Sequence, residues 1–235
     1  VWHLGDNLED ATSNNLDGVN RPDKPTVNTN GIIGDAQEFG VNQILVIRPP
    51  GAKPGRRVTC MPSGNADRTM SAWVNPTSFE GRNWAQASIG GWGEPERGQK
   101  PNMGLSYFTM TGRGQPRFHL YGFDPRCASL LPRNEWRHVA LAVSGDMVRF
   151  YVDGIQDRTI NNNGEAVTRL GTLRTPKSTP VDLGDHGNGR GPFNGALDEV
   201  RFESVARSGY WLRLSFENQK PLQSLVGPLV QDGEE

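Results

Sequence analysis

The chain of 235 residues holds 25 Lys or Arg and 26 Asp or Glu, for a formal net charge of −1, together with 29 Gly and 17 Pro. Its basic residues occur singly or in pairs, which speaks against nucleic-acid binding because that function needs a clustered basic surface. No apolar run is long enough to cross a bilayer, so we expect no membrane insertion.

The predicted elements are short strands joined by Gly- and Pro-rich turns. In chain order, a first strand at residues 1–4 precedes a polar loop that runs to residue 30, and strands follow at residues 36–39 and 43–47. Residues 48–67 hold four prolines and three glycines, which predicts a loop or insertion. Further strands are expected at residues 69–74, 84–89, 104–109 and 117–122.

A hairpin is the strongest local signal. Two β-prone runs, residues 136–144 and 147–152, meet at Gly145-Asp146, and the second run ends at Asp153-Gly154. Such dipeptides are typical of hairpin turns. Weaker strands are expected at residues 157–160 and 181–183, a closing strand at residues 196–202, and a short helix or final strand at residues 208–218. This spacing predicts an all-β, two-sheet antiparallel β-sandwich.

The length fits one domain. We expect a β-sandwich over residues 1–220 and a C-terminal linker over residues 221–235, which lack aromatic side chains. The chain starts in a strand-like pattern without a signal peptide, so we interpret it as one domain of a larger protein.

The order of several segments resembles the laminin-G-like, concanavalin A-like jelly-roll family. The opening "VWHLGD" and "DATSNNLDG", then "GIIGDAQEF" and "MSAWVNP", match its first strands and loop. The hairpin "WRHVALAV…VRFYVDG" and the strand "FNGALDEVRF", followed by "SVARSGYWL", match its end. Residues 48–68 depart from the pattern because they are longer and richer in Pro and Gly. The resemblance implies a jelly-roll recognition module, of the subtype found in large secreted or surface-anchored bacterial proteins.

The resemblance also implies a calcium ion between the opening loop and the closing strand. Asp10 and Asp198 are the ligands expected from it, with Asn14 as a possible third, because Ca²⁺ takes six to eight oxygen ligands. Asp198 lies in an otherwise apolar strand, where an unpaired carboxylate is costly to bury. The alternative is a salt bridge from Asp198 or Glu199 to Arg201 or Arg207, with Asp10 as a turn residue.

The related glucanases carry their catalytic carboxylates on alternate residues of one strand. Simple alternation here places Asp198 with Val200 and Phe202 on one face, and Glu199 with Arg201 and Glu203 on the other. The pair of carboxylates on one face is therefore absent. No serine-hydrolase elbow, phosphate loop or Cys/His pair supports another chemistry, so we expect a protein that is not an enzyme.

Trp92 is the predicted centre of a carbohydrate-binding site. It lies in Gly90-Gly91-Trp92-Gly93, whose small neighbours cannot bury it locally, and an exposed aromatic ring suits stacking on a sugar. Arg97, His119 and Tyr121 are the other expected contacts; His119 and Tyr121 share one face of a predicted strand. The alternatives are a Trp92 folded over the end of the sandwich and a strand face that merely meets solvent.

Cys60 and Cys127 both lie in predicted loops. Such a pair in a Gly-rich β protein predicts one disulfide in an oxidising compartment, and the alternative is two free, partly buried thiols. Neither cysteine has a partner at zinc-ligand spacing.

Together these patterns predict a non-catalytic, lectin-like module that binds a polysaccharide or other glycan, belongs to a secreted or cell-surface protein, and uses Ca²⁺. The alternative functions are a structural or adhesive spacer that binds other protein domains and, more remotely, an enzyme of unrecognised type.

Overall fold

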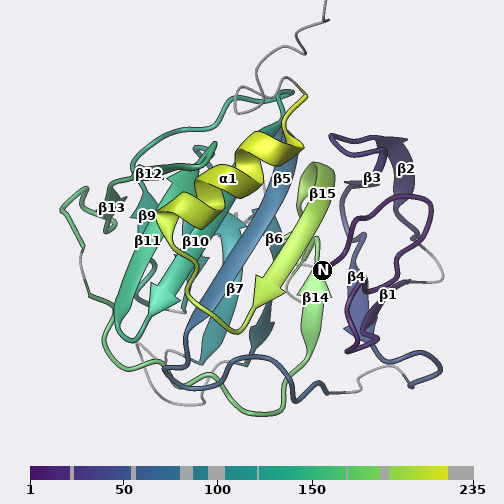
Figure 1. Ribbon diagram of the computed structural model, residues 1–235, viewed down its shortest axis with the longest axis horizontal. Helices are drawn as coiled ribbons and strands as arrows, with labels where there is room; N and C mark the ends of the chain where they lie inside the picture. The colour runs from purple at the N-terminus through teal and green to yellow at the C-terminus, as the bar shows by residue number, and fades with distance from the viewer. Residues whose placement is uncertain are drawn as a thin grey trace, which may run out of the picture.

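The computed structural model describes residues 1–21, 24–53, 57–79, 87–94, 104–120, 122–167, 169–185 and 191–221. The described chain forms two antiparallel sheets packed face to face, with one helix on the outside (Figure 1). This is the predicted β-sandwich.

The first sheet has eight strands, in the spatial order β1(Asp17–Asn20), β4(Leu45–Arg48), β14(Val181–Leu183), β6(Ala87–Gly93), β7(Leu105–Met110), β8(Pro116–His119), β9(Arg126–Cys127) and β13(Thr159–Ile160). The second has seven, in the order β12(Ile155–Asp157), β11(Met147–Val152), β10(Arg137–Ser144), β5(Arg68–Ser78), β15(Asn194–Glu203), β3(Asp35–Phe39) and β2(Val27–Asn30). Four of the seven neighbouring pairs in the eight-stranded sheet join strands that are not consecutive in the chain, so its register depends largely on long-range pairing.

The predicted hairpin is confirmed. Strands β10 and β11 pair from Val139–Val152 to Ser144–Met147, which leaves Gly145 and Asp146 as a two-residue turn. Gly145 has φ +58°. At the next turn Asp153 and Gly154 both have positive φ, at +50° and +71°. A positive φ at both central residues is the requirement of the type I′ turn, which explains the Asp-Gly dipeptide.

The N-terminal prediction was wrong in two respects. Residues 1–4 do not form a strand; Trp2 instead makes isolated bridges to Val200 on one side and to Asp10 on the other. The expected polar loop contains the edge strands β1 and β2. Their composition is polar because β2 is mostly exposed and β1 is buried at only one position. The sequence of β1 and β2 therefore lacks the hydrophobic alternation from which a strand is predicted.

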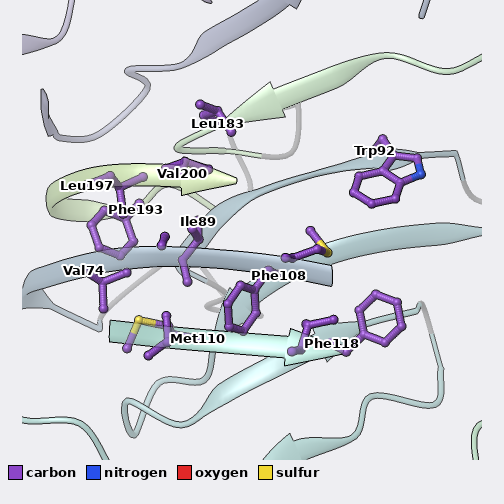
Figure 2. Close-up of a cluster of buried hydrophobic side chains, with 14 of the residues drawn as sticks. Val74, Ile89, Trp92, Phe108, Met110, Phe118, Leu183, Phe193, Leu197 and Val200 are labelled. Carbon is purple, nitrogen blue, oxygen red and sulfur yellow. The ribbon is translucent and has the colours of Figure 1, made fainter. Parts of the chain in front are cut away.

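The core lies between the two sheets. Figure 2 shows Trp92 of β6 and Phe108 of β7 in the same cluster of buried side chains as Val74 of β5 and Leu197 of β15. Alternation explains which residues enter it: Phe108 and Met110 point inward from β7, whereas the alternate residues Tyr107 and Thr109 are absent from the cluster and point outward. The outward side chains of the eight-stranded sheet therefore make a separate surface.

The helix α1(Gly209–Gln219) lies across the outer face of the seven-stranded sheet (Figure 1). Ser208 caps its first turn, since its Oγ accepts a hydrogen bond of 3.2 Å from the backbone N of Trp211. Leu212 packs on Ala140 and Ala142, and Trp73 Nε1 donates to Gln219 Oε1 at 2.9 Å. The helix thus covers this sheet, while the outer face of the other sheet has no helix of the described chain over it.

Strand β15 contains a bulge that the sequence pattern did not indicate. Its register against β5 shifts between Asp198 and Arg201, and Glu199 has φ +50°. As a result Leu197 and Val200 both enter the core. Asp198 lies opposite Trp73, whose indole bonds to the helix, so Asp198 belongs to the helix side of the sheet. The expected common face for Asp198 and Val200 was therefore wrong, because the bulge interrupts simple alternation.

Candidate functional site

Trp92 is buried, which contradicts its predicted exposure. Its side chain is 0% exposed, its Nε1 donates to Pro62 O at 2.9 Å, and its ring centroid lies 5.3 Å from that of Phe202. The neighbouring glycines are strand residues rather than loop residues. A Cβ on Gly91 would lie 2.8 Å from Tyr107 Cγ. These glycines therefore make room for side chains from other strands, and they do not present Trp92 to solvent.

Two of the other expected sugar contacts, Arg97 and Tyr121, lie outside the described residues. His119 is described. It ends β8, is 7% exposed, and its Nδ1 lies 3.1 Å from Asp124 Oδ1. It faces away from the core, since its neighbour Phe118 is a core residue.

The predicted disulfide between Cys60 and Cys127 is wrong, because both cysteines are free. Cys127 is buried in β9, where its Sγ donates to Asp157 Oδ2 at 2.7 Å. Burial raises the pKa of the Cys127 thiol, and the Asp157 carboxylate raises it further. Cys60 is exposed as a residue, and partial desolvation of its sulfur raises the pKa of its thiol. Cys127 was expected in a loop, but its strand places it in the sandwich core.

Asp10 organises the opening loop. Its Oδ1 accepts hydrogen bonds from the Val1 N at 3.0 Å and the Thr12 N at 3.1 Å. Its Oδ2 accepts from Thr12 Oγ1 at 2.8 Å and from the Leu16 N at 3.1 Å. Because both oxygens already serve two protein donors each, this carboxylate does not fit the role of a calcium ligand. Asn14 is exposed and its side chain donates to Thr12 Oγ1.

Asp198 is in a different environment. Its Oδ2 accepts from the backbone N of Ile32 at 2.7 Å and of Ile33 at 3.1 Å, whereas its buried Oδ1 has no hydrogen-bond partner. Burial raises the pKa of Asp198, against the opposing effect of these two amides. The backbone of Trp2 runs between Asp10 and Val200, with one on each side, so Asp10 and Asp198 do not converge. In the described part of the chain, no three His, Cys, Asp or Glu side chains are grouped to hold a metal ion.

A cavity of about 80 Å³ lies beside Trp2. Asp10, Asn14 and Cys60 all line it, together with Phe202. The structure thus brings together three residues that the sequence assigned to two different roles. The volume of this cavity is smaller than that of a typical small-molecule binding pocket, which is roughly 300–1,000 Å³.

The outer face of the eight-stranded sheet gathers polar side chains in a row across the strands. Asp182 of β14 pairs with Gly91 of β6, Gly91 with Tyr107 of β7, and Tyr107 with His119 of β8. Residues paired directly across strands point to the same face. The Tyr107 side chain lies over Gly91, and its Oη donates to Asp182 Oδ2 at 3.2 Å. Only a residue without Cβ permits this contact.

A second row runs beside the first. Ser88 of β6 pairs with Thr109 of β7, Thr109 with Arg117 of β8, and Arg117 with Arg126 of β9. Arg117 Nε donates to Thr109 Oγ1 at 3.2 Å. We call the two rows together the outer polar face. Its carboxylate lies at the β14 end and its two arginines lie at the β8 and β9 end.

The electrostatics of the outer polar face are unusual at Asp182. Burial and the nearby Asp185 charge together raise the pKa of Asp182 to about 7, against the opposing effect of the Tyr107 hydroxyl. Burial also raises the pKa of Tyr107 well above its usual value. Tyr107, His119 and Asp182 are buried, whereas Arg117 and Arg126 are partly exposed. The arginine end is therefore the more open part of this face.

Tyr107, Asp182, Arg117 and Arg126 were not identified from the sequence. The available signal was the alternation in "LSYFTM", which places the tyrosine and the threonine on one side of the strand and the phenylalanine and the methionine on the other. Their convergence depends on the pairing of β6 with β14, about ninety positions away in the chain.

Comparison with known proteins agrees with this architecture. Residues 56–212 match the family described as the concanavalin A-like lectin/glucanases superfamily. None of the curated proteins searched matches the sequence. No helix among the described residues is long and apolar enough to cross a membrane.

Among solved structures, domain 4 of AbnA, a GH43 extracellular arabinanase from Geobacillus stearothermophilus solved with arabinotriose, has a TM-score of 0.62 at 17% identity, covering 88% of this chain and 92% of that one. Botulinum neurotoxin type C, whose cell entry depends on two ganglioside molecules, has a TM-score of 0.55 at 10% identity, covering 94% and 50%. The binding domain of botulinum neurotoxin serotype G has a TM-score of 0.54 at 6% identity, covering 90% and 48%. At these identities the likeness shows the fold.

Proposed function

Because the chain belongs to the concanavalin A-like lectin/glucanases superfamily, we propose that it is a non-catalytic carbohydrate-binding module whose glycan lies on the outer polar face of the eight-stranded sheet. The observation that carries the proposal is the row from Asp182 through Gly91 and Tyr107 to His119. It combines an aromatic ring, a carboxylate and an imidazole on one side of a rigid sheet.

These groups suit a sugar chemically. A carboxylate accepts hydrogen bonds from neighbouring hydroxyls, and a guanidinium donates hydrogen bonds to them. Arg117 and Arg126 are the partly exposed groups of this face. Cross-strand neighbours are about 4.8 Å apart, so the row is long enough to follow a short chain of sugar units. Its polar groups give orientation, and the sheet holds them in place.

The similar structures support the same class of ligand. The arabinanase domain was solved with arabinotriose, and the neurotoxin of type C interacts with gangliosides. The arabinanase is described as extracellular, which supports a secreted or cell-surface location for this chain. We also propose that the chain comes from a bacterial protein, as the sequence resemblance implies.

The proposal includes Asp198 as a ligand of a calcium ion, and it no longer includes Asp10 as one. The buried, unpartnered Oδ1 of Asp198 suits a cation ligand, whereas the carboxylate of Asp10 is filled by protein donors. An ion at Asp198 would fix the segment that begins at Ile32 relative to the closing strand. It would therefore support the fold at a distance from the outer polar face.

The test is glycan-array screening followed by isothermal titration calorimetry with the best oligosaccharide. At a pH above the Asp182 pKa of about 7, where this carboxyl is ionised, we expect the wild-type protein to bind and Asp182→Asn to weaken binding about tenfold through loss of a charged acceptor. Asp146→Asn is the matched control, because Asp146 lies in a hairpin turn and pairs with Arg169.

If no glycan binds at millimolar concentration, the proposal is wrong and the alternative of a protein-binding spacer replaces it. Release of reducing ends from the bound glycan would contradict the absence of catalysis.

A further inference from the structure

Arg117 and Arg126 stand directly opposite each other on neighbouring strands. They are cross-strand partners in β8 and β9, and both point away from the core, because Phe118 and Cys127 beside them point into it. Two like charges in this position are destabilising unless something compensates them. The arrangement therefore calls for a negative group close to both.

The described protein supplies only part of that compensation. The Asp124 carboxylate is near, but its Oδ1 accepts from the backbone N of Leu120 at 2.8 Å and lies 3.1 Å from His119 Nδ1. Arg126 Nη1 and Nη2 donate to Asn162, whose oxygens are neutral. Within the described residues, neither guanidinium is in ion-pair contact with a carboxylate.

Both guanidinium groups also keep unused donors. Arg117 Nη2 and Arg126 Nε are buried and have no hydrogen-bond partner. An unsatisfied buried donor on a charged group is costly, so such groups usually have a hydrogen-bond partner. Burial lowers the pKa of Arg117; the Asp124 charge opposes this, and the Arg126 charge lowers it further. An anion bound between the two would favour the charged form of both.

The geometry points to an anion subsite between Arg117 and Arg126, so that the glycan bound on the outer polar face carries a carboxylate or sulfate group at its β8 and β9 end. This inference rests on the proposed function and names the class of its ligand: an acidic oligosaccharide. Arginine suits that role because its planar fork pairs with the two oxygens of a carboxylate or sulfate.

The carboxylates at the opposite end of the outer polar face favour the same orientation of the ligand, with its acidic unit at the arginine end. Asp182 is in β14, three strands away from β8, the strand that carries Arg117. Asp185 lies near Asp182. Carboxylates there accept from hydroxyl groups and repel a second acid. The expected ligand therefore has its acidic unit over Arg117 and Arg126 and neutral, hydroxyl-rich units over Tyr107 and Asp182.

The experiment compares an acidic and a neutral oligosaccharide of equal length, oligogalacturonate and oligogalactose, by isothermal titration calorimetry. We expect wild-type protein to prefer the acidic one by about 10- to 100-fold, the range of a charged hydrogen-bonded pair. The preference should fall as NaCl is raised. Arg117→Gln and Arg126→Gln should each remove most of it, and Arg117→Lys should retain part of it.

Arg169→Gln is the matched control, since Arg169 is an exposed arginine that pairs with Asp146 in the hairpin turn. Thermal unfolding of each variant shows that it is folded. In parallel, inorganic sulfate should raise the melting temperature of the wild type and of Arg169→Gln, but not of Arg117→Gln.

The outcomes separate the two proposals. Equal affinity for the two oligosaccharides would overturn the anion subsite and leave carbohydrate binding intact. Absence of binding to every glycan would overturn the proposed function. If sulfate also failed to stabilise the wild type, the anion subsite would be rejected on its own evidence.

Discussion

Trp92 is held by contacts that come from distant parts of the chain. Pro62 accepts its indole hydrogen bond, Phe202 packs against its ring, and the Arg68 guanidinium lies 5.6 Å from its ring centroid. Its burial is thus a result of how the two sheets meet. It also changes the expected effect of a substitution there, from lost binding to lost stability.

We predict that Trp92→Ala lowers the free energy of unfolding by about 3–5 kcal/mol, because it leaves a large cavity in the core. Urea denaturation followed by circular dichroism measures this. Trp211→Ala is the control, since Trp211 is only partly buried on the helix surface, and a smaller loss is expected. A Trp92→Ala variant as stable as the wild type would contradict the structure.

Asp182 makes stability depend on pH. Its pKa rises from 3.8 to about 7 on folding, so between these values the folded state keeps a proton that the unfolded state releases. Stability from this group is present below pH 3.8 and is lost as pH rises toward 7. At about 1.4 kcal/mol per pH unit, the loss reaches roughly 4 kcal/mol.

We predict that the difference in unfolding free energy between wild type and Asp182→Asn shifts by a few kcal/mol in favour of the variant from pH 4.5 to pH 7.5. Urea titrations at both pH values measure it. Groups with a lowered pKa, such as Asp124 and Asp157, act in the opposite direction but cancel in this difference. A difference that is constant with pH would show that Asp182 titrates normally.

The calcium proposal concerns one residue, Asp198. A cation that binds only the folded state raises the melting temperature by mass action. We predict that a chelator lowers the melting temperature of the wild type and leaves Asp198→Asn unchanged. Asp10→Asn should be less stable than wild type and still respond to the chelator. If the wild type ignores the chelator, Asp198 is held by the Ile32 and Ile33 amides alone.

At the scale of elements, the helix α1 is attached at several points. The turn at Gly154 passes so close that a Cβ there would lie 2.8 Å from the Cα of Arg213. Glu217 is buried and pairs with Arg213 inside the helix and with Lys220 just after its end, both at 2.5 Å. The helix therefore belongs to the folded domain, and it covers the outer face of the seven-stranded sheet (Figure 1).

We predict that Ser208→Ala destabilises the protein by about 1 kcal/mol, because it removes the side-chain acceptor of the first helical turn. Chemical denaturation measures the loss. Ser178→Ala serves as the control, since Ser178 contacts Arg57 through its backbone carbonyl. Equal stability of the two variants would mean that the cap is not needed.

For the whole molecule, stability has to come from the core between the sheets, because the two cysteines are not joined. We predict that a reductant leaves the melting temperature unchanged, and that thiol titration of unreduced, denatured protein finds two free thiols. Burial keeps the Cys127 thiol protonated, so in the native protein Cys60 should react first. Finding no free thiol would restore the disulfide.

The sequence by itself determined the fold class, the family and the central hairpin. Gly145 and Gly154 specify their turns locally, since each has a positive φ that glycine accepts. Alternation in strands such as β7 separated inward from outward residues. These signals act within a few residues, and they can be recognised without knowing what packs against them.

Only the tertiary structure shows which residues the proposed site brings together. The register of β6 against β14 and β7 aligns Asp182, Gly91 and Tyr107. The sequence of β6 alone does not indicate this register. The same long-range packing buries Trp92, separates Cys60 from Cys127, and creates the bulge that moves Asp198 away from the face of Val200. Sheet register arises from contacts between distant segments, so local preferences did not reveal these arrangements.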